Sequence, residues 1–90
     1  MADRKTASNM VTTLENITTL PSGNKGELVA VAREVNEWAV GHPQMGRNPA
    51  EFSTAVDNYV KTTDRANWQR VQAAARRLIP SFRELGNARL

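Results

Sequence analysis

The side chains best suited to bind another molecule are the arginines near the C-terminus. Six of the nine arginines fall within residues 64–90, and only Asp64 and Glu84 oppose them, so this segment carries a net charge of +4. Residues 1–63 hold six basic and seven acidic groups. Because a guanidinium group donates two parallel hydrogen bonds to a phosphate or a carboxylate, the segment indicates contact with an acidic molecule.

The helix predicted to begin at Arg65 sorts these arginines into two rows. At about 100° per residue, Arg65 and Arg76 lie on one border of its polar arc. Arg70 and Arg77 lie on the other border, and uncharged or small side chains lie between the rows. The backbone of a duplex fits between two such rows. These four arginines are therefore the predicted site for phosphate or for a protein partner.

The same arrangement also fits a structural role. An arginine at the edge of an apolar stripe covers the core edge with its methylene stem while its head stays in water. The whole-chain charge of +3 is mild for a dedicated nucleic-acid-binding protein. The sequence is therefore compatible with two interpretations of these arginines: a solvated border of the core or a binding site.

Motifs for catalysis or metal binding are missing from the sequence. The lack of cysteine excludes disulfides, thiolate zinc sites and a cysteine nucleophile. His42 is the single histidine, and we expect an ordinary surface residue. Glu34 and Glu37 share the outer face of a helix, where a general acid or base lacks a pocket. Segment 22–27 resembles a phosphate-binding loop in composition but not in spacing. We expect no enzyme activity, cofactor, metal or small-molecule substrate.

The size of the chain predicts one domain over residues 1–90, with frayed ends at 1–7 and 87–90. Hydrophobic residues make up 40% of the chain and charged residues 23%, which is typical of a globular protein. The small core favours a homodimer. The sequence has no long apolar run and no apolar region after Met1–Lys5, so we expect a cytoplasmic protein without a membrane partner.

Apolar residues recur at spacings of three and four, which predicts helices rather than strands. The first segment is rich in threonine, which favours a strand, but strict alternation is missing. The four predicted helices run from Ser8 or Asn9 to about Leu20, from Lys25 to Val40, from Pro49 to about Lys61, and from Arg65 onward. Their predicted N-caps are Ser8 or Asn9, Asn24, Asn48 and Asp64.

Pro80 predicts a break in the last helix, because proline lacks a backbone donor and its ring clashes with the preceding turn. Ser81 and Glu84 then form the capping box of a separate last turn, which ends at Gly86. The predicted fold class is all-α: a compact four-helix bundle or orthogonal array with a proline-broken C-terminal helix.

One apolar stripe on each helix predicts the core. Trp38 and Trp68 are central to their stripes and are expected to be core anchors rather than partner contacts. Leu20 is expected to end the stripe of the first helix. Val29 and Val40 fall off the stripe of their helix, beside Asn36, and predict contact with a further helix, a partner chain or a second copy.

A helix-turn-helix motif is only weakly indicated. The turn at Thr62–Asp64 has a suitable length, but Trp68 and Val71 in the following helix are expected to be buried. The sequence therefore predicts a small non-enzymatic regulatory protein that acts through protein contacts, as an inhibitor or adaptor, with a partner or with itself. The alternative is a duplex nucleic-acid-binding protein that contacts the phosphate backbone through its basic C-terminal helix.

Overall fold

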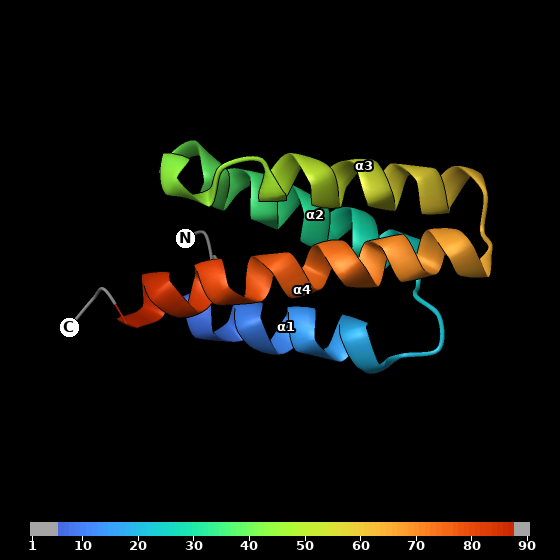
Figure 1. Cartoon of the computed structure of the whole chain (residues 1–90), viewed down its shortest axis with the longest axis horizontal. Helices are drawn as coiled ribbons and strands as arrows, with labels where there is room; N and C mark the ends of the chain where they lie inside the picture. The colour runs from blue at the N-terminus through green and yellow to red at the C-terminus, as the bar shows by residue number, and fades with distance from the viewer. Residues whose placement is uncertain (1–5, 88–90) are drawn as a thin grey trace.

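The computed structural model describes residues 6–87, which form four α-helices and one short 3₁₀ turn (Figure 1). The helices are α1 (Ala7–Thr19), α2 (Lys25–Val40), α3 (Asn48–Lys61) and α4 (Arg65–Asn87), and the turn η1 (Pro43–Met45) joins α2 to α3. No strand occurs within this range, so the all-α prediction is confirmed. The fraying predicted at the two ends falls mostly outside the described residues. Ala7 and Asn87, which do lie within them, are helical.

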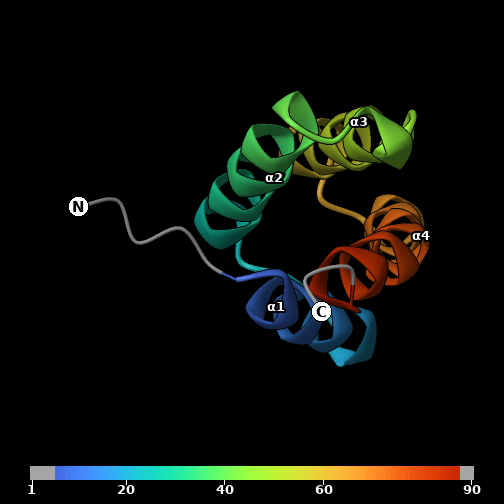
Figure 2. The ribbon, with the colours of Figure 1, turned by 90° about the vertical axis from the view of Figure 1, so that its left-hand side faces the viewer.

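The helices form a bundle in which neighbours in space are not always neighbours in sequence. α4 packs along both α1 and α3, and α3 packs along α2 (Figure 2). α1 and α2 are joined by a short connection but do not pack closely along each other, and a pocket of about 220 Å³ lies between them. The order around the bundle is therefore α1, α4, α3, α2. The helices share one long direction in Figure 1, which excludes an orthogonal array.

Two of the predicted helix caps are confirmed. The side chain of Asn24 accepts a hydrogen bond from the backbone N–H of Glu27 at 2.9 Å. The carboxylate of Asp64 accepts one from the N–H of Asn67 at 2.8 Å. Each bond satisfies a backbone donor that has no partner within the first turn of a helix, so α2 and α4 begin where predicted.

The other two predicted caps are wrong by one or more residues. α1 is capped by Thr6, whose hydroxyl accepts from the N–H of Asn9 at 3.1 Å, and this earlier start places Ala7 in the core. α3 already includes Asn48, because the carbonyl of Arg47 accepts the N–H of Glu51 at 2.9 Å. Arg47 makes no capping hydrogen bond with its side chain.

The break predicted at Pro80 is not found, since α4 continues through this residue to Asn87. Pro80 is exposed, whereas Leu78 and Phe82 on either side of it are fully buried. A carbonyl that loses its partner on the solvent face can bond to water, so the cost of the proline is reduced. Packing of the two flanking side chains then keeps the last turns helical.

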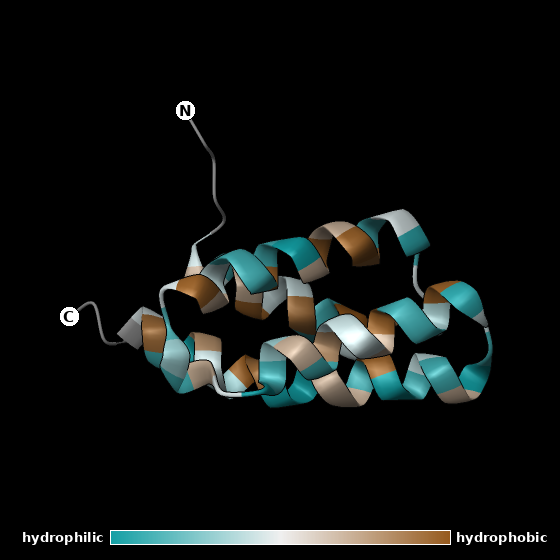
Figure 3. Cartoon of the chain, turned by 90° about the horizontal axis from the view of Figure 1, so that it is seen from above, coloured by the Kyte–Doolittle hydropathy of each residue, from teal (hydrophilic) through white to brown (hydrophobic). Residues whose placement is uncertain are grey.

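The core follows the predicted stripes, with a few differences. Hydrophobic and hydrophilic residues alternate along the helices in Figure 3, as amphipathic packing requires. Trp68 is buried as predicted, while Trp38 is half-buried. Leu20 is 46% exposed because α1 ends at Thr19 and Leu20 has an extended backbone. Met45 is buried although it lies in a predicted loop, because η1 turns it toward the core.

Replacing Gly86 by alanine should slightly stabilise the protein, because Gly86 lies in the last turn of α4, which ends at Asn87, and does not have a positive φ. A Cβ atom there would be 3.8 Å from the nearest atom, the Cβ of Ala7, which is ordinary contact. In the middle of a helix, alanine is more stable than glycine by about 0.5–1 kcal/mol, and the gain in a last turn is smaller. Gly46→Ala should have the opposite effect, since Gly46 has a φ of +63°. Thermal unfolding of both variants checks this, and destabilisation by Gly86→Ala would contradict the continuous helix.

Candidate functional site

The outer face of α4 carries all four arginines of the predicted site, and each of them is exposed. α4 is bordered by α1 on one side and by α3 on the other, so its two polar borders face different neighbours. Arg77 bonds to Glu51 of α3 at 3.1 Å. Arg83 bonds to Glu15 of α1 at 2.7 Å. Arg83 is seven residues beyond Arg76 and so continues the row of Arg65 and Arg76 along the unbroken helix. The row of Arg77 therefore lies along α3, and the row of Arg83 lies along α1.

These two ion pairs reduce the free charge of the face. The side chains involved are 46–65% exposed, and exposed pairs of this kind contribute only about 0–1 kcal/mol to stability. Their larger effect is electrostatic, because each places a carboxylate at a border of α4. Within residues 6–87, Arg65 and Arg76 form no ion pair.

Arg70 has a different environment, because it contacts the buried side chain of Asn67. Its guanidinium donates to the amide oxygen of Asn67 at 3.3 Å. The amide nitrogen of Asn67 in turn donates to the carbonyl of Thr62 at 2.8 Å. Asn67 thus satisfies the turn between α3 and α4, and Arg70 is tied to that turn. The sequence showed no sign of a buried asparagine on this helix.

A strip of small side chains lies between the two rows. Ala66, Ala73 and Pro80 follow each other at intervals of seven residues, and all three are exposed. Residues seven apart lie close to one line along a helix, so these side chains leave the backbone of α4 accessible. Glu84 follows at the C-terminal end of the same strip. A flat partner surface can therefore approach α4 closely between the arginines.

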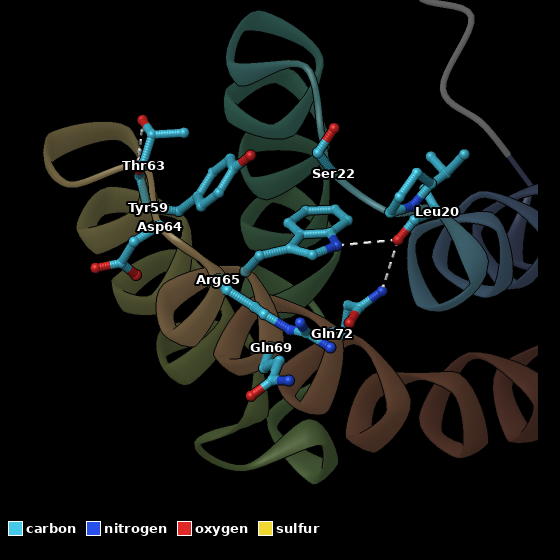
Figure 4. Close-up of a pocket in the computed structure, with 10 residues that line it drawn as sticks. Leu20, Ser22, Tyr59, Thr63, Asp64, Arg65, Gln69 and Gln72 are labelled. Carbon is cyan, nitrogen blue, oxygen red and sulfur yellow. Dashed lines mark hydrogen bonds between the residues drawn. The ribbon is translucent and has the colours of Figure 1, made fainter.

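A pocket of about 610 Å³ lies at one end of the bundle, next to the first turns of α4 (Figure 4). It is walled by the connection between α1 and α2, by the turn between α3 and α4, and by the side chains of Arg65 and Gln69. Trp68 also lines the pocket and donates from Nε1 to the carbonyl of Leu20 at 3.0 Å. Gln72 donates to the same carbonyl at 3.0 Å.

The polar atoms of this pocket are occupied mainly by contacts within the chain. Gln72 also donates to the carbonyl of Ile17 at 3.1 Å, so a single amide holds the end of α1. The hydroxyl of Tyr59 lies 3.4 Å from both the nitrogen and the oxygen of Gly23, and its ring is 5.2 Å from that of Trp68. Both rings are buried. The residues that line the pocket therefore attach α1 and the connection that follows it to α3 and α4.

The packing of Trp68 against this connection requires glycine at position 23. A Cβ atom there would lie 2.5 Å from the Trp68 ring and 2.8 Å from Leu28. No side chain fits in that space unless the ring moves. The Pro21-Ser22-Gly23 sequence indicates a turn, but it does not indicate that a tryptophan distant in sequence fills the space beneath it.

The second candidate surface is a groove of about 470 Å³ between α2 and α3. Val29 and Val40 line it and are 40% and 88% exposed, so both lie outside the core, as their offset from the apolar stripe predicted. Asn36 of α2 donates to the hydroxyl of Ser53 of α3 at 2.8 Å, which fastens the two walls together.

The remaining candidate side chain is the single histidine, His42. His42 is half-buried rather than fully on the surface: its Nδ1 lies 2.7 Å from the carbonyl oxygen of Trp38. Its ring is 5.4 Å from that of Trp38. Among the described residues, no group of three or more histidine, cysteine or acidic side chains can hold a metal ion. Nor does any helix in that part of the chain have the length and apolar character needed to cross a membrane.

Comparison with known proteins gives no relative: no family model matches the chain, and neither do any curated proteins or solved structures.

Gly23→Ala should destabilise the protein by about 1–3 kcal/mol, the usual cost of overpacking a core. Gly41→Ala is the matched control, because a Cβ atom there meets nothing within 4 Å. In a Trp68→Phe background the Gly23→Ala change should cost less, since a phenylalanine ring lacks the atoms that clash with the new Cβ. Urea unfolding of the four variants of this cycle measures the coupling. Equal costs in the two backgrounds would contradict the assigned contact.

Proposed function

We propose that this chain is a small non-enzymatic regulatory protein that occupies an acidic surface of a protein partner with the outer face of α4, as an inhibitor or adaptor does. The observation that carries this proposal is the pair Arg65 and Arg76, two exposed guanidinium groups without ion pairs in the described chain. They stand beside the strip of small side chains on a helix with five arginines and one glutamate. Arginine is favoured in protein interfaces because it binds carboxylates bidentately and its stem packs on apolar surface.

The acidic groups around α4 favour a protein over a nucleic acid. Glu51 and Glu15 lie at its two borders, and Glu84 lies within its strip. A duplex backbone carries phosphate along its whole length, so it would bring negative charge against these carboxylates. A protein surface can instead place carboxylates opposite Arg65 and Arg76 and neutral or basic groups elsewhere.

Replacing Arg65 and Arg76 together by alanine should weaken binding to the partner about tenfold or more, since interface arginines are often hot spots. Arg77→Ala with Arg83→Ala is the matched control, because it removes the same charge from residues that are already paired within the chain. The partner is first recovered from cell extract with the unaltered protein, and affinities of both double variants are then measured. Equal losses in the two variants, or recovery of no partner, would contradict the proposal.

A second candidate function is binding to a nucleic-acid duplex through the same face. Arg65, Gln69 and Arg76 are all exposed on one side of α4, and guanidinium and amide groups are the usual donors to phosphate oxygens. Single strands are less suitable ligands because Trp68 and Tyr59, which could stack on bases, are buried.

Titration with duplex DNA, duplex RNA and single strands at two salt concentrations tests this second function. Duplex binding should weaken steeply as salt rises, and the variant with Arg65→Ala and Arg76→Ala should show a salt slope smaller by about one for each phosphate that it no longer binds. Circular dichroism of the variant controls for helicity. Flat binding, or none at low salt, sinks the nucleic-acid hypothesis while leaving the protein-binding proposal standing.

A further inference from the structure

The groove between α2 and α3 exposes a stripe that the described chain does not cover. Val29, Arg33, Asn36 and Val40 line it from α2 and follow each other at spacings of four, three and four. This is the spacing by which one helix packs against another in a coiled coil. The two outer members are large exposed apolar side chains, and the two inner members are polar.

The stripe has the same character in both directions. Val29 and Val40 are equally distant from its centre, and so are Arg33 and Asn36. A second α2 that runs antiparallel across the first therefore places valine opposite valine and arginine opposite asparagine. Such self-complementarity is what a two-fold symmetric interface requires.

The charges around the stripe point to the same occupant. Arg33, Glu37 and Asp57 line the groove, and within residues 6–87 none of them forms an ion pair. In the antiparallel register, Arg33 of one copy lies within one residue, about 1.5 Å along the helix axis, of Glu37 of the other. The amide oxygen of Asn36 is a further acceptor, since the hydrogen bond of this side chain to Ser53 uses its nitrogen. The complementary partner must carry both signs of charge in reverse order, as a second copy does.

We propose that this groove is the interface of a two-fold homodimer in which the two α2 helices cross antiparallel. Val29 of each copy packs against Val40 of the other, and Arg33 of each bonds to Asn36 and Glu37 of the other. α4 lies across the bundle from α2 (Figure 2), so both arginine faces stay accessible in this dimer. The dimer does not depend on the partner proposed for α4.

Disulfide trapping tests the interface directly, because the chain has no cysteine of its own. Val29→Cys and Val40→Cys are made in separate chains and oxidised alone and as a mixture. In the antiparallel dimer, residue 29 faces residue 40, while equivalent residues are about 16 Å apart along the axis. A disulfide needs its Cβ atoms within about 3.5–4.5 Å. The mixture should therefore form a cross-linked dimer of one Val29→Cys and one Val40→Cys chain, and neither variant should do so alone.

Three results would overturn the proposal. Cross-linking of each variant with itself in preference to the mixture would mean a parallel pairing. Equal cross-linking of Ala73→Cys, which lies on the exposed face of α4, would mean random collision. A lack of cross-links in every combination would mean that a different molecule, or none, covers the groove.

A charge exchange gives an independent readout by sedimentation of the full chain. Arg33→Glu and Glu37→Arg should each lose the dimer, because each places like charges opposite one another in the two copies. Mixing the two variants should restore the dimer, since one chain is then acidic at positions 33 and 37 and the other is basic at both. Both contacts between position 33 of one copy and position 37 of the other again join opposite charges. Arg76→Glu, on the other side of the bundle, should leave the dimer intact, and circular dichroism verifies folding. Dimers of unchanged stability in either single variant would refute the proposed contacts.

Discussion

The arrangement of this bundle depends on the contact of Trp68 with the connection between α1 and α2. Because α1 and α2 do not pack closely along each other, α1 is held mainly by α4. Trp68 and Gln72 bind the carbonyl of Leu20, where α1 ends, and the Trp68 ring fills the space that Gly23 leaves open. One aromatic side chain thus joins a helix end, a turn and the core, and the path of the chain from α1 to α2 follows from it.

The position of α4 between α1 and α3 also decides which surfaces are available. Only one arc of α4 faces solvent, and its borders are partly neutralised by Glu15 and Glu51. The proposed partner binding rests on Arg65 and Arg76, two cations that form no ion pair within residues 6–87. On the other side of the molecule, α2 and α3 leave Val29 and Val40 exposed beside a groove. The two surfaces are separate, so a dimer and a bound partner are compatible.

Much of the fold could be predicted from local patterns. The caps at Asn24 and Asp64 marked the start of α2 and α4, because a capping side chain and its donor lie within one turn. The pattern was misleading at Pro80, where the local preference for a break is overcome by burial of Leu78 and Phe82. The local pattern did not indicate that Met45 is buried, because the turn η1 directs this side chain into the core. These failures share a cause, since each depends on packing against elements distant in sequence.

For the candidate surfaces, local patterns were enough to predict the four helices, the two rows of arginine and the offset of Val29 and Val40 from the core stripe. Helical periodicity is a local property, so residue order suffices for these. The packing of the helices brings Arg83 to Glu15, 68 residues away, and Arg77 to Glu51, 26 residues away. The same packing makes α3 the second wall of the groove and places Trp68 against Gly23. Which side chains meet depends on how whole helices pack, and no local spacing encodes that.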